Sequence, residues 1–459
     1  MIEGLKPYAE YKESDIPWAR ALPTSWQTER AKRLFTKMQR PVRPEDDVVT
    51  CFRDGMVTLR KNRRLRGFTE ATVFSGYQGI RKGDLVIHGM DAFAGAIGVS
   101  DSDGKGTPVY NVCKPGPGVV ASYYAHTVRE MSRSQWILAL AKGIRERSSD
   151  FRYEMFGNQI VPLPPPHEQA AIVRFLDHAN RKIDGFIRTK RKLIGLLNEQ
   201  KQAIIHRAVT RGLDPNVPLR PSGVPWLGDI PKHWTLKRFK FIARINSGQV
   251  DPRESRYRKL VLIAPNHIQS GSGRLLAQET ADEQGADSGK YLVSRGQIIY
   301  SKIRPNLRKA TIAPCDCLCS ADMYPITPTK EVLPEFLLLL LLSQPFTKFA
   351  VDCSMRVAMP KANREALANC LMWYPEPDEQ RKVLATVERE SAPYDTAIAR
   401  TEREIALMQE YRTRLTADLV TGKLDVREAA AKLPAPLTDE VAEPTSDEPL
   451  EEVAIEESE

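Results

Sequence analysis

Two short basic runs are the parts of this sequence whose residue types and spacing are best suited to binding chemistry. Lysine and arginine neutralise phosphates, and arginine or asparagine can bind a base edge through two hydrogen bonds. The alternative for each run is a solvated basic loop without a ligand. We predict that the DNA-binding residues are Arg60, Lys61, Arg63, Arg64 and Arg66 in the first run, and Ser301, Lys302, Arg304, Asn306, Arg308 and Lys309 in the second.

Catalytic motifs are missing from the 459 residues. Gly104-Lys105-Gly106 has neither the spacing nor the hydroxyl of a phosphate-binding loop, and no nucleophile elbow, zinc-protease helix or dinucleotide fingerprint occurs. Pro377-Asp378-Glu379 superficially resembles a nuclease carboxylate motif, but Pro166-His167-Glu168 repeats it with a histidine in place of the aspartate. A carboxylate at a helix N-terminus accounts for both copies. The sequence therefore predicts no catalytic residue, no metal site and no cofactor on this chain.

The body of the chain is strongly basic. The whole sequence carries a net charge of +9, yet residues 433–459 hold ten acidic residues and no Lys or Arg. Without those ten negative charges, the other residues carry about +19. A body of that charge favours a polyanionic partner, and the alternative is a generally basic surface.

Cysteine usage and hydropathy indicate the compartment. Seven cysteines, an odd number, follow an N-terminus with no apolar core, which predicts a cytoplasmic protein. The longest apolar run, Phe336–Leu342, has seven residues and is too short to cross a bilayer, so we expect no membrane partner. Cys315, Cys317 and Cys319 alternate, which in a strand places small side chains on one buried face. Zinc sites usually use Cys-x₂-Cys spacing instead.

The sequence also repeats itself about 210 residues later. Three matches occur in the same order, with shifts of 208, 211 and 211 residues, which indicates a tandem duplication. A duplicated chain tends to fold with pseudo-twofold symmetry, which suits a pseudo-symmetric partner such as duplex DNA. The matches are Pro17-Trp18…Pro23…Trp26 with Pro225-Trp226…Pro231…Trp234, Pro164-x-Pro166-x-Glu168-Gln169 with Pro375-x-Pro377-x-Glu379-Gln380, and Val209-Thr210…Leu213-Asp214 with Val420-Thr421…Leu424-Asp425.

Each copy ends in a pattern typical of one long helix. Prolines precede the pattern and a glycine follows it, at Gly212 and Gly422. Apolar residues recur at the 3.5-type spacing of a helix that packs on another helix. We therefore predict an antiparallel coiled coil, and the alternative is that each helix packs on its own domain. The predicted seam consists of Leu176, Ile183, Ile187, Ile194, Leu197 and Ile204, and of Val387, Tyr394, Ile398, Ile405, Met408 and Leu415.

The part of each copy before its helix mixes short apolar strands with helices and frequent Gly, Pro and Asn. The fold class is therefore α/β (α+β): two mixed domains joined by two long helices with pseudo-twofold symmetry. The domains beyond their first residues match poorly, whereas the helices match well, so the domains are expected to bind different targets. The predicted divisions are 1–165, helix 166–212, 213–375, helix 376–426 and an acidic, disordered tail 427–459.

Three segments together resemble the specificity subunit of type I restriction–modification systems. The resemblance covers nearly the whole chain except the acidic tail. The N-terminal Asp15-Ile16-Pro17-Trp18 is a weaker copy that lacks the Gly228-Asp229 pair. The segments are Gly223-Val224-Pro225-Trp226-Leu227-Gly228-Asp229-Ile230-Pro231-x-x-Trp234, Pro162-Leu163-Pro164-Pro165-Pro166-x-Glu168-Gln169 and Ser301-Lys302-Ile303-Arg304-Pro305.

The resemblance implies that the two mixed domains are target-recognition domains. Each would bind one half of a bipartite, asymmetric sequence in double-stranded DNA, and the two helices would fix the spacing between the halves. Two modification subunits, which use S-adenosylmethionine to methylate adenine, would dock on this chain, and restriction subunits with motor and endonuclease activity would complete the complex. The alternatives are a recognition fragment of a fused restriction–modification enzyme and a coiled-coil scaffold with no DNA role.

Overall fold

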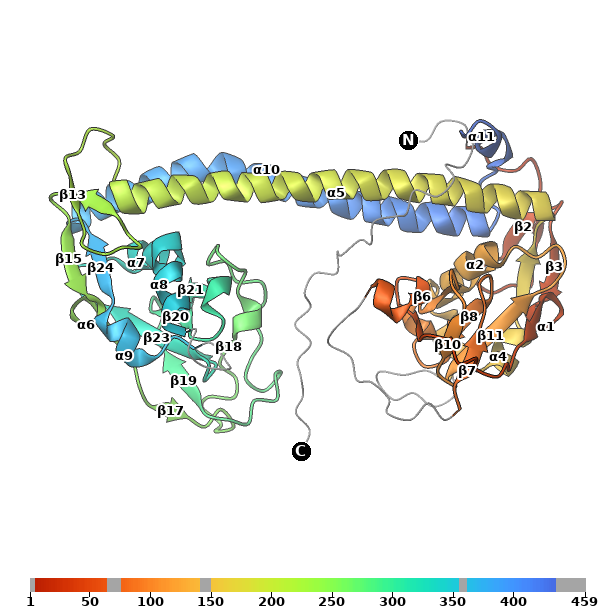
Figure 1. Cartoon of the computed structure of the whole chain (residues 1–459), viewed down its shortest axis with the longest axis horizontal. Helices are drawn as coiled ribbons and strands as arrows, with labels where there is room; N and C mark the ends of the chain where they lie inside the picture. The colour runs from red at the N-terminus through yellow and green to blue at the C-terminus, as the bar shows by residue number, and fades with distance from the viewer. Residues whose placement is uncertain (1–4, 64–75, 141–149, 355–360, 435–459) are drawn as a thin grey trace. The chain divides into compact units, whose positions relative to one another are not determined.

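The computed structural model describes residues 5–63, 76–140, 150–354 and 361–434. These residues form two compact units (Figure 1). Unit 1 lies within Met1–Thr189 and Arg403–Val453, and unit 2 lies within Lys190–Glu402. Each unit therefore combines one mixed α/β segment with a part of both long helices.

Unit 1 is built around a four-stranded antiparallel sheet in the order β4-β11-β8-β9. Two-stranded antiparallel sheets and short helices surround it. The central strands are β4 (Phe35–Lys37), β8 (Leu85–His88), β9 (Ile97–Val99) and β11 (Tyr110–Pro115). The paired strands are β1 (Tyr11–Glu13) with β2 (Ala21–Pro23), β3 (Gln27–Arg30) with β12 (Ile160–Leu163), β5 (Val49–Cys51) with β6 (Val57–Leu59), and β7 (Gln78–Ile80) with β10 (Gly104–Gly106). The helices are α1 (Ala31–Leu34), α2 (Ala121–Arg133), α3 (Trp136–Leu140) and α4 (Tyr153–Gly157).

Unit 2 repeats this plan and adds a second four-stranded sheet, β17-β19-β22-β18. The central strands, in the order β16-β23-β20-β21, are β16 (Ala243–Ile245), β20 (Ile298–Ser301), β21 (Ala310–Ile312) and β23 (Met323–Pro328). The added strands are β17 (Gln249–Val250), β18 (Leu262–Ile263), β19 (Lys290–Val293) and β22 (Cys317–Cys319). The two-stranded sheets pair β13 (Leu219–Pro221) with β14 (Asp229–Pro231) and β15 (Thr235–Arg238) with β24 (Leu371–Tyr374). The helices are α6 (Phe239–Ile242), α7 (Pro334–Leu342), α8 (Gln344–Ser354) and α9 (Arg364–Asn369).

The two units thus share their central sheet and two flanking strand pairs, as a tandem duplication predicts. Strand β8 corresponds to β20, and each follows a glycine with positive φ, Gly83 at 90° and Gly296 at 85°. A glycine adopts this left-handed conformation without the steric cost that a Cβ atom imposes. The predicted mixed α/β fold class is confirmed.

The two long helices are α5 (Pro166–Arg211) and α10 (Pro377–Val420). Each begins with proline and acidic residues in its first turn and is followed by a glycine of positive φ, Gly212 or Gly422. The helices pack together and run antiparallel within each unit (Figure 1). In unit 2, Lys201 pairs with Asp395 at 2.5 Å and Arg207 with Glu390 at 3.4 Å. Residue numbers therefore rise along α5 where those of their partners on α10 fall, as they do in antiparallel helices.

The twelve predicted seam residues lie on these helices, and none of them is exposed. Five are buried: Leu176, Ile183, Ile187, Val387 and Leu415. The other seven are half-buried: Ile194, Leu197, Ile204, Tyr394, Ile398, Ile405 and Met408.

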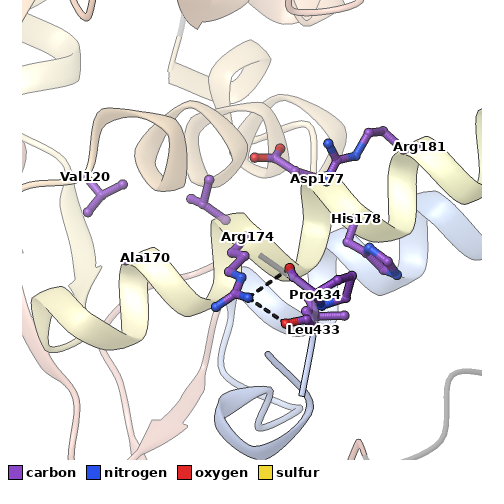
Figure 2. A pocket seen from close by; sticks show the side chains of 9 residues that line it. Val120, Ala170, Arg174, Asp177, His178, Arg181, Leu433 and Pro434 are labelled. Carbon is purple, nitrogen blue, oxygen red and sulfur yellow. Dashed lines mark hydrogen bonds between the residues drawn. The ribbon is translucent and has the colours of Figure 1, made fainter. Parts of the chain in front are cut away.

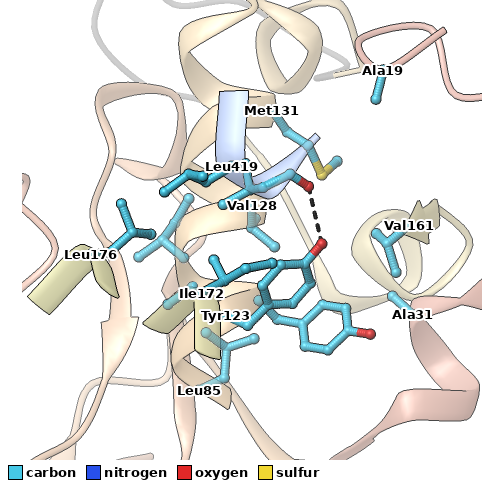
Figure 3. Close-up of a cluster of buried hydrophobic side chains, with 14 of the residues drawn as sticks. Ala19, Ala31, Leu85, Tyr123, Val128, Met131, Val161, Ile172, Leu176 and Leu419 are labelled. Carbon is cyan, nitrogen blue, oxygen red and sulfur yellow. Dashed lines mark hydrogen bonds between the residues drawn. The ribbon is translucent and has the colours of Figure 1, made fainter. Parts of the chain in front are cut away.

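The ends of both helices belong to the cores of the mixed domains. In unit 1, Ile172 and Leu176 of α5 and Leu419 of α10 surround Tyr123 of α2 (Figure 3). The Tyr123 hydroxyl donates a hydrogen bond to the Val420 carbonyl at 3.0 Å, and in unit 2 Trp373 Nε1 donates to the Val209 carbonyl at 2.6 Å. Each domain therefore satisfies a carbonyl that the last turn of a helix leaves unpaired.

The repeated Trp and Glu-Gln motifs meet at a junction in each unit. Trp26 Nε1 donates to Glu168 at 2.6 Å in unit 1, and Trp234 Nε1 donates to Glu379 at 3.0 Å in unit 2. The neighbouring glutamine binds the backbone just before a domain helix. Its side-chain oxygen accepts from Val120 N at 2.9 Å in unit 1 and from Leu333 N at 2.8 Å in unit 2. These contacts fix each mixed domain on the start of its long helix.

The C-terminal part of the described chain completes unit 1. The predicted tail starts at residue 427, but residues Arg427–Ala431 form α11, and Ala429 and Ala430 are buried in the core. The tail prediction placed this boundary too early, because Val426, Ala429 and Ala430 supply a short apolar face at helical spacing. Residues 435–459 of the predicted tail lie outside the described residues.

Arg427 connects this segment to the unit 1 junction. Its guanidinium pairs with Asp425 at 2.6 Å and with Glu168 at 3.2 Å. The Glu168 side chain is only 1% exposed, so loss of the arginine leaves a buried carboxylate without its cation. We expect Arg427→Ala to lower the free energy of unfolding by about 2 kcal/mol, a value reduced from the buried-pair range because Arg427 is half exposed.

A double-mutant cycle measured by urea denaturation checks this expectation. Glu168→Gln keeps an oxygen that accepts from Trp26 Nε1 and removes the charge, so Arg427→Ala should cost less in that background. An equal loss in both backgrounds would show that the Glu168 pair contributes nothing.

Within the described ranges, no single helix is long and apolar enough to cross a membrane. Helices α7 and α8 meet the length and composition test only as a pair bent by 61°. Phe336, Leu340 and Phe346 of this pair are buried in the core of unit 2.

Candidate nucleic-acid interface

The first basic run follows strand β6 in unit 1 and packs on the β5–β6 hairpin. Arg60 Nε donates to the Thr50 hydroxyl at 3.3 Å. Lys61 pairs with Asp47 at 2.6 Å, and both side chains are exposed. The Lys61 ammonium lowers the pKa of the Asp47 carboxyl through a hydrogen bond and its charge. Arg63 pairs with Asp54 at 2.6 Å, and the guanidinium of Arg63 stacks on the ring of Phe52 at 4.5 Å.

The hairpin therefore holds these three cations, which remain predicted DNA contacts. Arg64 and Arg66 of the same prediction lie outside the described residues.

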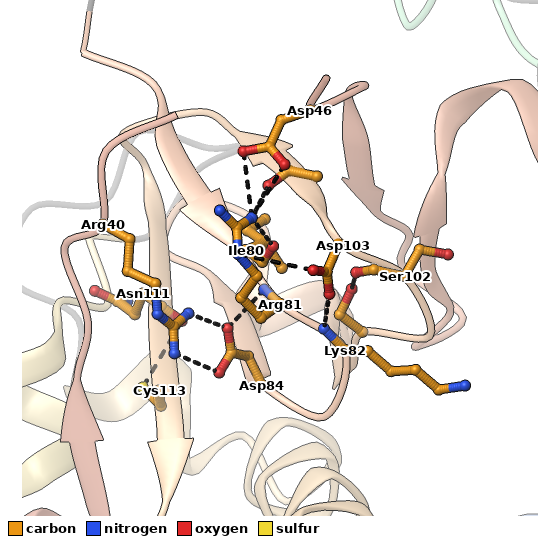
Figure 4. A network of polar contacts seen from close by, with 12 residues as sticks. Arg40, Asp46, Ile80, Arg81, Lys82, Asp84, Ser102, Asp103, Asn111 and Cys113 are labelled. Atoms are coloured by element: carbon orange, nitrogen blue, oxygen red, sulfur yellow. Dashed lines mark hydrogen bonds and ion pairs between the residues drawn. The ribbon is translucent and has the colours of Figure 1, made fainter. Parts of the chain in front are cut away.

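Other arginines of unit 1 form internal ion pairs and are poorly placed to bind phosphate (Figure 4). Arg40 pairs with Asp84, whose side chain is 4% exposed, and Arg81 pairs with Asp46 at 3.1 Å. The Asp84 carboxylate also accepts from Arg81 N at 2.8 Å. This network holds the turn that leads into β8.

The second basic run connects β20 to β21 in unit 2. It contains two arginines in the left-handed backbone region, Arg304 at φ 46° and Arg308 at φ 49°. A residue with a Cβ atom is strained there by roughly 1–2 kcal/mol. Backbone hydrogen bonds hold the turn: Leu307 N donates to the Arg304 carbonyl at 2.9 Å, and Ser301 N donates to the Lys309 carbonyl at 2.9 Å. Strain of this kind is commonly found at functional sites.

The structure divides the side chains of this run between the surface and the protein interior. Arg304 and Asn306 are exposed. Ser301 is buried, and Lys302 Nζ donates to the Ala321 carbonyl at 2.6 Å. Arg308 is half-buried and donates to the Gln202 side chain of α5 at 3.2 Å. Lys309 is half-buried and directly precedes β21. Arg304 and Asn306 are therefore the residues of this run best placed to reach a base edge.

Tyr324 and Arg364 also lie beside this turn, and no motif in the sequence marks them. The Tyr324 ring has Lys302 Nζ at 5.4 Å and the Arg364 guanidinium at 5.3 Å. Arg364 also donates to the carbonyl of Asn246 at 2.8 Å. The three residues come from β23, α9 and the β20–β21 turn, so only the fold brings them together.

The two basic runs do not occupy equivalent positions. The counterpart of the β20–β21 turn in unit 1 is the β8–β9 turn, where Asp91 pairs with Arg53 at 3.0 Å. The first run instead follows β6. The predicted contacts therefore diverge in position as well as in residue type between the two units.

In the part of the chain that the structure describes, no three His, Cys, Asp or Glu side chains gather as metal ligands would. The seven cysteines all lie within the described ranges, and no disulfide joins them. Cys317 and Cys319 are buried on β22, and Cys315 is half-buried.

Thiol accessibility gives a simple check on this arrangement. Burial raises the pKa of Cys51 and of Cys317 to about 12 and also raises those of Cys113, Cys319 and Cys370. A thiol reagent at pH 8 should therefore label the half-buried Cys315 and Cys353 first. The other five should react only after denaturant is added, as mass spectrometry of the labelled peptides would reveal. Rapid labelling of Cys317 in the folded chain would contradict the packing of β22.

Two mixed α/β units, each with parts of an antiparallel pair of long helices, make a fold that is also found in solved structures. A solved chain of the type I R-M system, from a structure of its complex assembly and conformational transition, has this fold, with a TM-score of 0.57. It is 13% identical, and the match covers 87% of this chain and 98% of that chain. The HsdS subunit of Thermoanaerobacter tengcongensis is 16% identical over 88% of this chain and 98% of its own, with a TM-score of 0.40.

In sequence, the chain is similar to the type I restriction enzyme EcoDI specificity subunit of Escherichia coli. The two are 31% identical over 279 residues, which are 58% of this chain and 62% of the relative. The match thus spans less than two thirds of the relative's length. No protein-family model matches the chain. The resemblance predicted from the sequence is confirmed.

Proposed function

We propose that this chain is the non-catalytic DNA-specificity subunit of a type I restriction–modification complex. The observation that carries the proposal is the 31% identity with a specificity subunit, on a chain that also has the fold of a type I R-M system structure. The duplicated architecture supports a bipartite target, with one half-site for each unit. The different sites of the two basic runs support unequal half-sites.

The proposed interface with double-stranded DNA combines attraction by the net charge with contacts by single side chains. A body charge of about +19 supplies the sequence-independent attraction to phosphates. Arg304 and Asn306 suit base recognition because arginine pairs with guanine and asparagine with adenine through two hydrogen bonds each. Lys61 suits a phosphate contact, since its side chain is exposed beside the β5–β6 hairpin of unit 1.

The long helices are proposed to dock two modification subunits, and restriction subunits would join the assembled complex. Large apolar side chains on these helices face solvent in this chain: Leu193 is 39% exposed and Leu196 50% exposed on α5, and Leu407 is 55% exposed on α10. An apolar surface of this kind is typical of a protein interface. S-adenosylmethionine would bind to the modification subunits and not to this chain. With seven cysteines and no disulfide between them, the complex is expected in the reducing cytoplasm.

Methylome sequencing of cells that carry this chain and its modification subunit tests the proposal. We expect methylated adenine in one asymmetric sequence with an unread spacer. Exchange of residues 1–165 for the corresponding domain of another specificity subunit should change one half of that sequence only. A change in both halves, or a complex that binds DNA with no dependence on salt, would refute the proposal.

A further inference from the structure

A groove on α5 in unit 1 receives the end of the described chain (Figure 2). Its volume is about 330 Å³, and its lining includes Ala170, Arg174, His178 and Arg181 of α5 together with Leu433 and Pro434. Arg174 Nη2 donates to the carbonyl oxygens of Leu433 at 2.7 Å and of Pro434 at 3.0 Å. The chain is therefore fixed in the groove at the point from which residues 435–459 continue.

Two cations, Arg174 and Arg181, line the groove, and Lys182 neighbours Arg181 in the sequence. Arg174, Arg181 and Lys182 are spaced seven and eight residues apart, which places them on one face of α5. Burial lowers the pKa of His178, and the positive charges of Lys182 and Arg181 lower it further. Asp177 is the opposing charge in the lining, and burial raises the pKa of its carboxyl. Arg174 Nε is buried without a hydrogen-bond partner.

The repeat shows that these cations are particular to unit 1. At the shift of 211 residues, which preserves Glu168-Gln169 as Glu379-Gln380, the counterparts of Arg174, Arg181 and Lys182 are Ala385, Ala392 and Pro393. Helix α10 has its own cations, Arg381, Lys382 and Arg389, at the counterparts of Ala170, Ala171 and His178. The two helices therefore present their cations in different patterns, and the acidic segment departs from the unit that has the α5 pattern.

We propose that residues 435–459 bind in this groove along α5 of unit 1, with their carboxylates against Arg174, Arg181 and Lys182. The segment supplies ten acidic residues and no Lys or Arg. A single exposed ion pair contributes only about 0.2–1 kcal/mol. A segment tethered at Pro434 nevertheless meets the groove at a high effective concentration, so several weak pairs hold it in place. The bound segment covers these cations against other polyanions. This inference does not depend on the proposed function.

Photo-crosslinking in the full-length chain tests the proposal. The photoreactive residue p-benzoylphenylalanine is placed at Ala170, which is exposed and lines the groove. The matched control places it at Arg381, the exposed counterpart of Ala170 on α10. After irradiation of dilute protein, monomeric products are digested and analysed by mass spectrometry. We expect crosslinks from Ala170 to peptides of residues 435–459, and a yield at least about fivefold lower from Arg381.

The electrostatic origin is tested in the same assay. About 1 M salt shortens the Debye length to about 3 Å and should lower the yield from Ala170 without any further substitution. The double variant Arg181→Glu/Lys182→Glu should lower it about fivefold, and Lys382→Glu/Arg389→Glu on α10 should leave it unchanged. Crosslinks only to other parts of the chain or to a second copy would overturn the proposal. Equal yields from Ala170 and Arg381, or a yield indifferent to salt and to charge reversal, would do the same.

Discussion

Replacement of Arg304 with glycine should weaken DNA binding about tenfold while leaving unit 2 as stable as before or slightly more stable. The loss follows from the proposed base contact of an exposed arginine, which is worth about 1–3 kcal/mol. The stability follows from the backbone, because Arg304 lies at φ 46°, where glycine adopts the conformation without Cβ strain. Titration of the complex with fluorescent duplexes and urea denaturation of the variant measure the two effects.

Arg308→Gly is the matched control, because Arg308 has nearly the same backbone conformation at φ 49°. Its guanidinium donates to Gln202 inside unit 2, so this variant should be less stable than Arg304→Gly and retain most of its DNA affinity. The sequence dependence of the lost DNA affinity also distinguishes a base contact by Arg304 from a phosphate contact. A base contact weakens binding to the methylated sequence more than to unrelated DNA, whereas a phosphate contact weakens both alike and reduces the salt dependence. Equal DNA affinity for Arg304→Gly and the parent chain would remove Arg304 from the interface.

The repeated motifs could be recognised in the sequence because each of them contacts another repeated motif in the structure. Trp26 and Glu168 are 142 residues apart, and their counterparts Trp234 and Glu379 are 145 apart, yet both pairs form the same hydrogen bond. A tryptophan N–H buried in a core needs an acceptor, so the two residue types must be kept together. The starts of both long helices and the end of α5 were predictable because proline, acidic residues and glycine act locally, whereas the predicted end of the second helix at residue 426 lies beyond its last residue, Val420.

The division of the basic residues was not predictable, because it depends on contacts between distant segments. Arg308 turns toward Gln202, 106 residues earlier in the chain, and Arg40 is held by Asp84. A count of positive charges therefore gives more arginines than are available to bind phosphate.

The continuity of α10 through Pro393 also runs against the local rule that proline ends a helix. Pro393 is exposed, so the carbonyl that loses its N–H partner can bind water.

The largest loss of stability is expected for Gln380→Ala. The Gln380 side chain is fully buried and makes three hydrogen bonds of 2.8 Å, from Leu333 N and to the carbonyls of Glu331 and Pro375. Its removal leaves one backbone donor and two acceptors without partners in a buried place. Because a buried polar group without a partner costs about 1–3 kcal/mol, we expect a loss of about 3 kcal/mol in the free energy of unfolding.

Substitution of two other glutamines tests whether the missing hydrogen bonds cause the loss of stability in Gln380→Ala. Gln169→Ala in unit 1 removes two such bonds, to Val120 N and to the Pro164 carbonyl, and should cost about 2 kcal/mol. Gln344→Ala, at an exposed position of α8, should change stability by less than about 0.5 kcal/mol. Urea denaturation gives the totals, and hydrogen exchange should locate the loosening at the start of α7 and along β24. If Gln380→Ala unfolded at the same urea concentration as Gln344→Ala, the junction would not be what fixes the mixed domain on its helix.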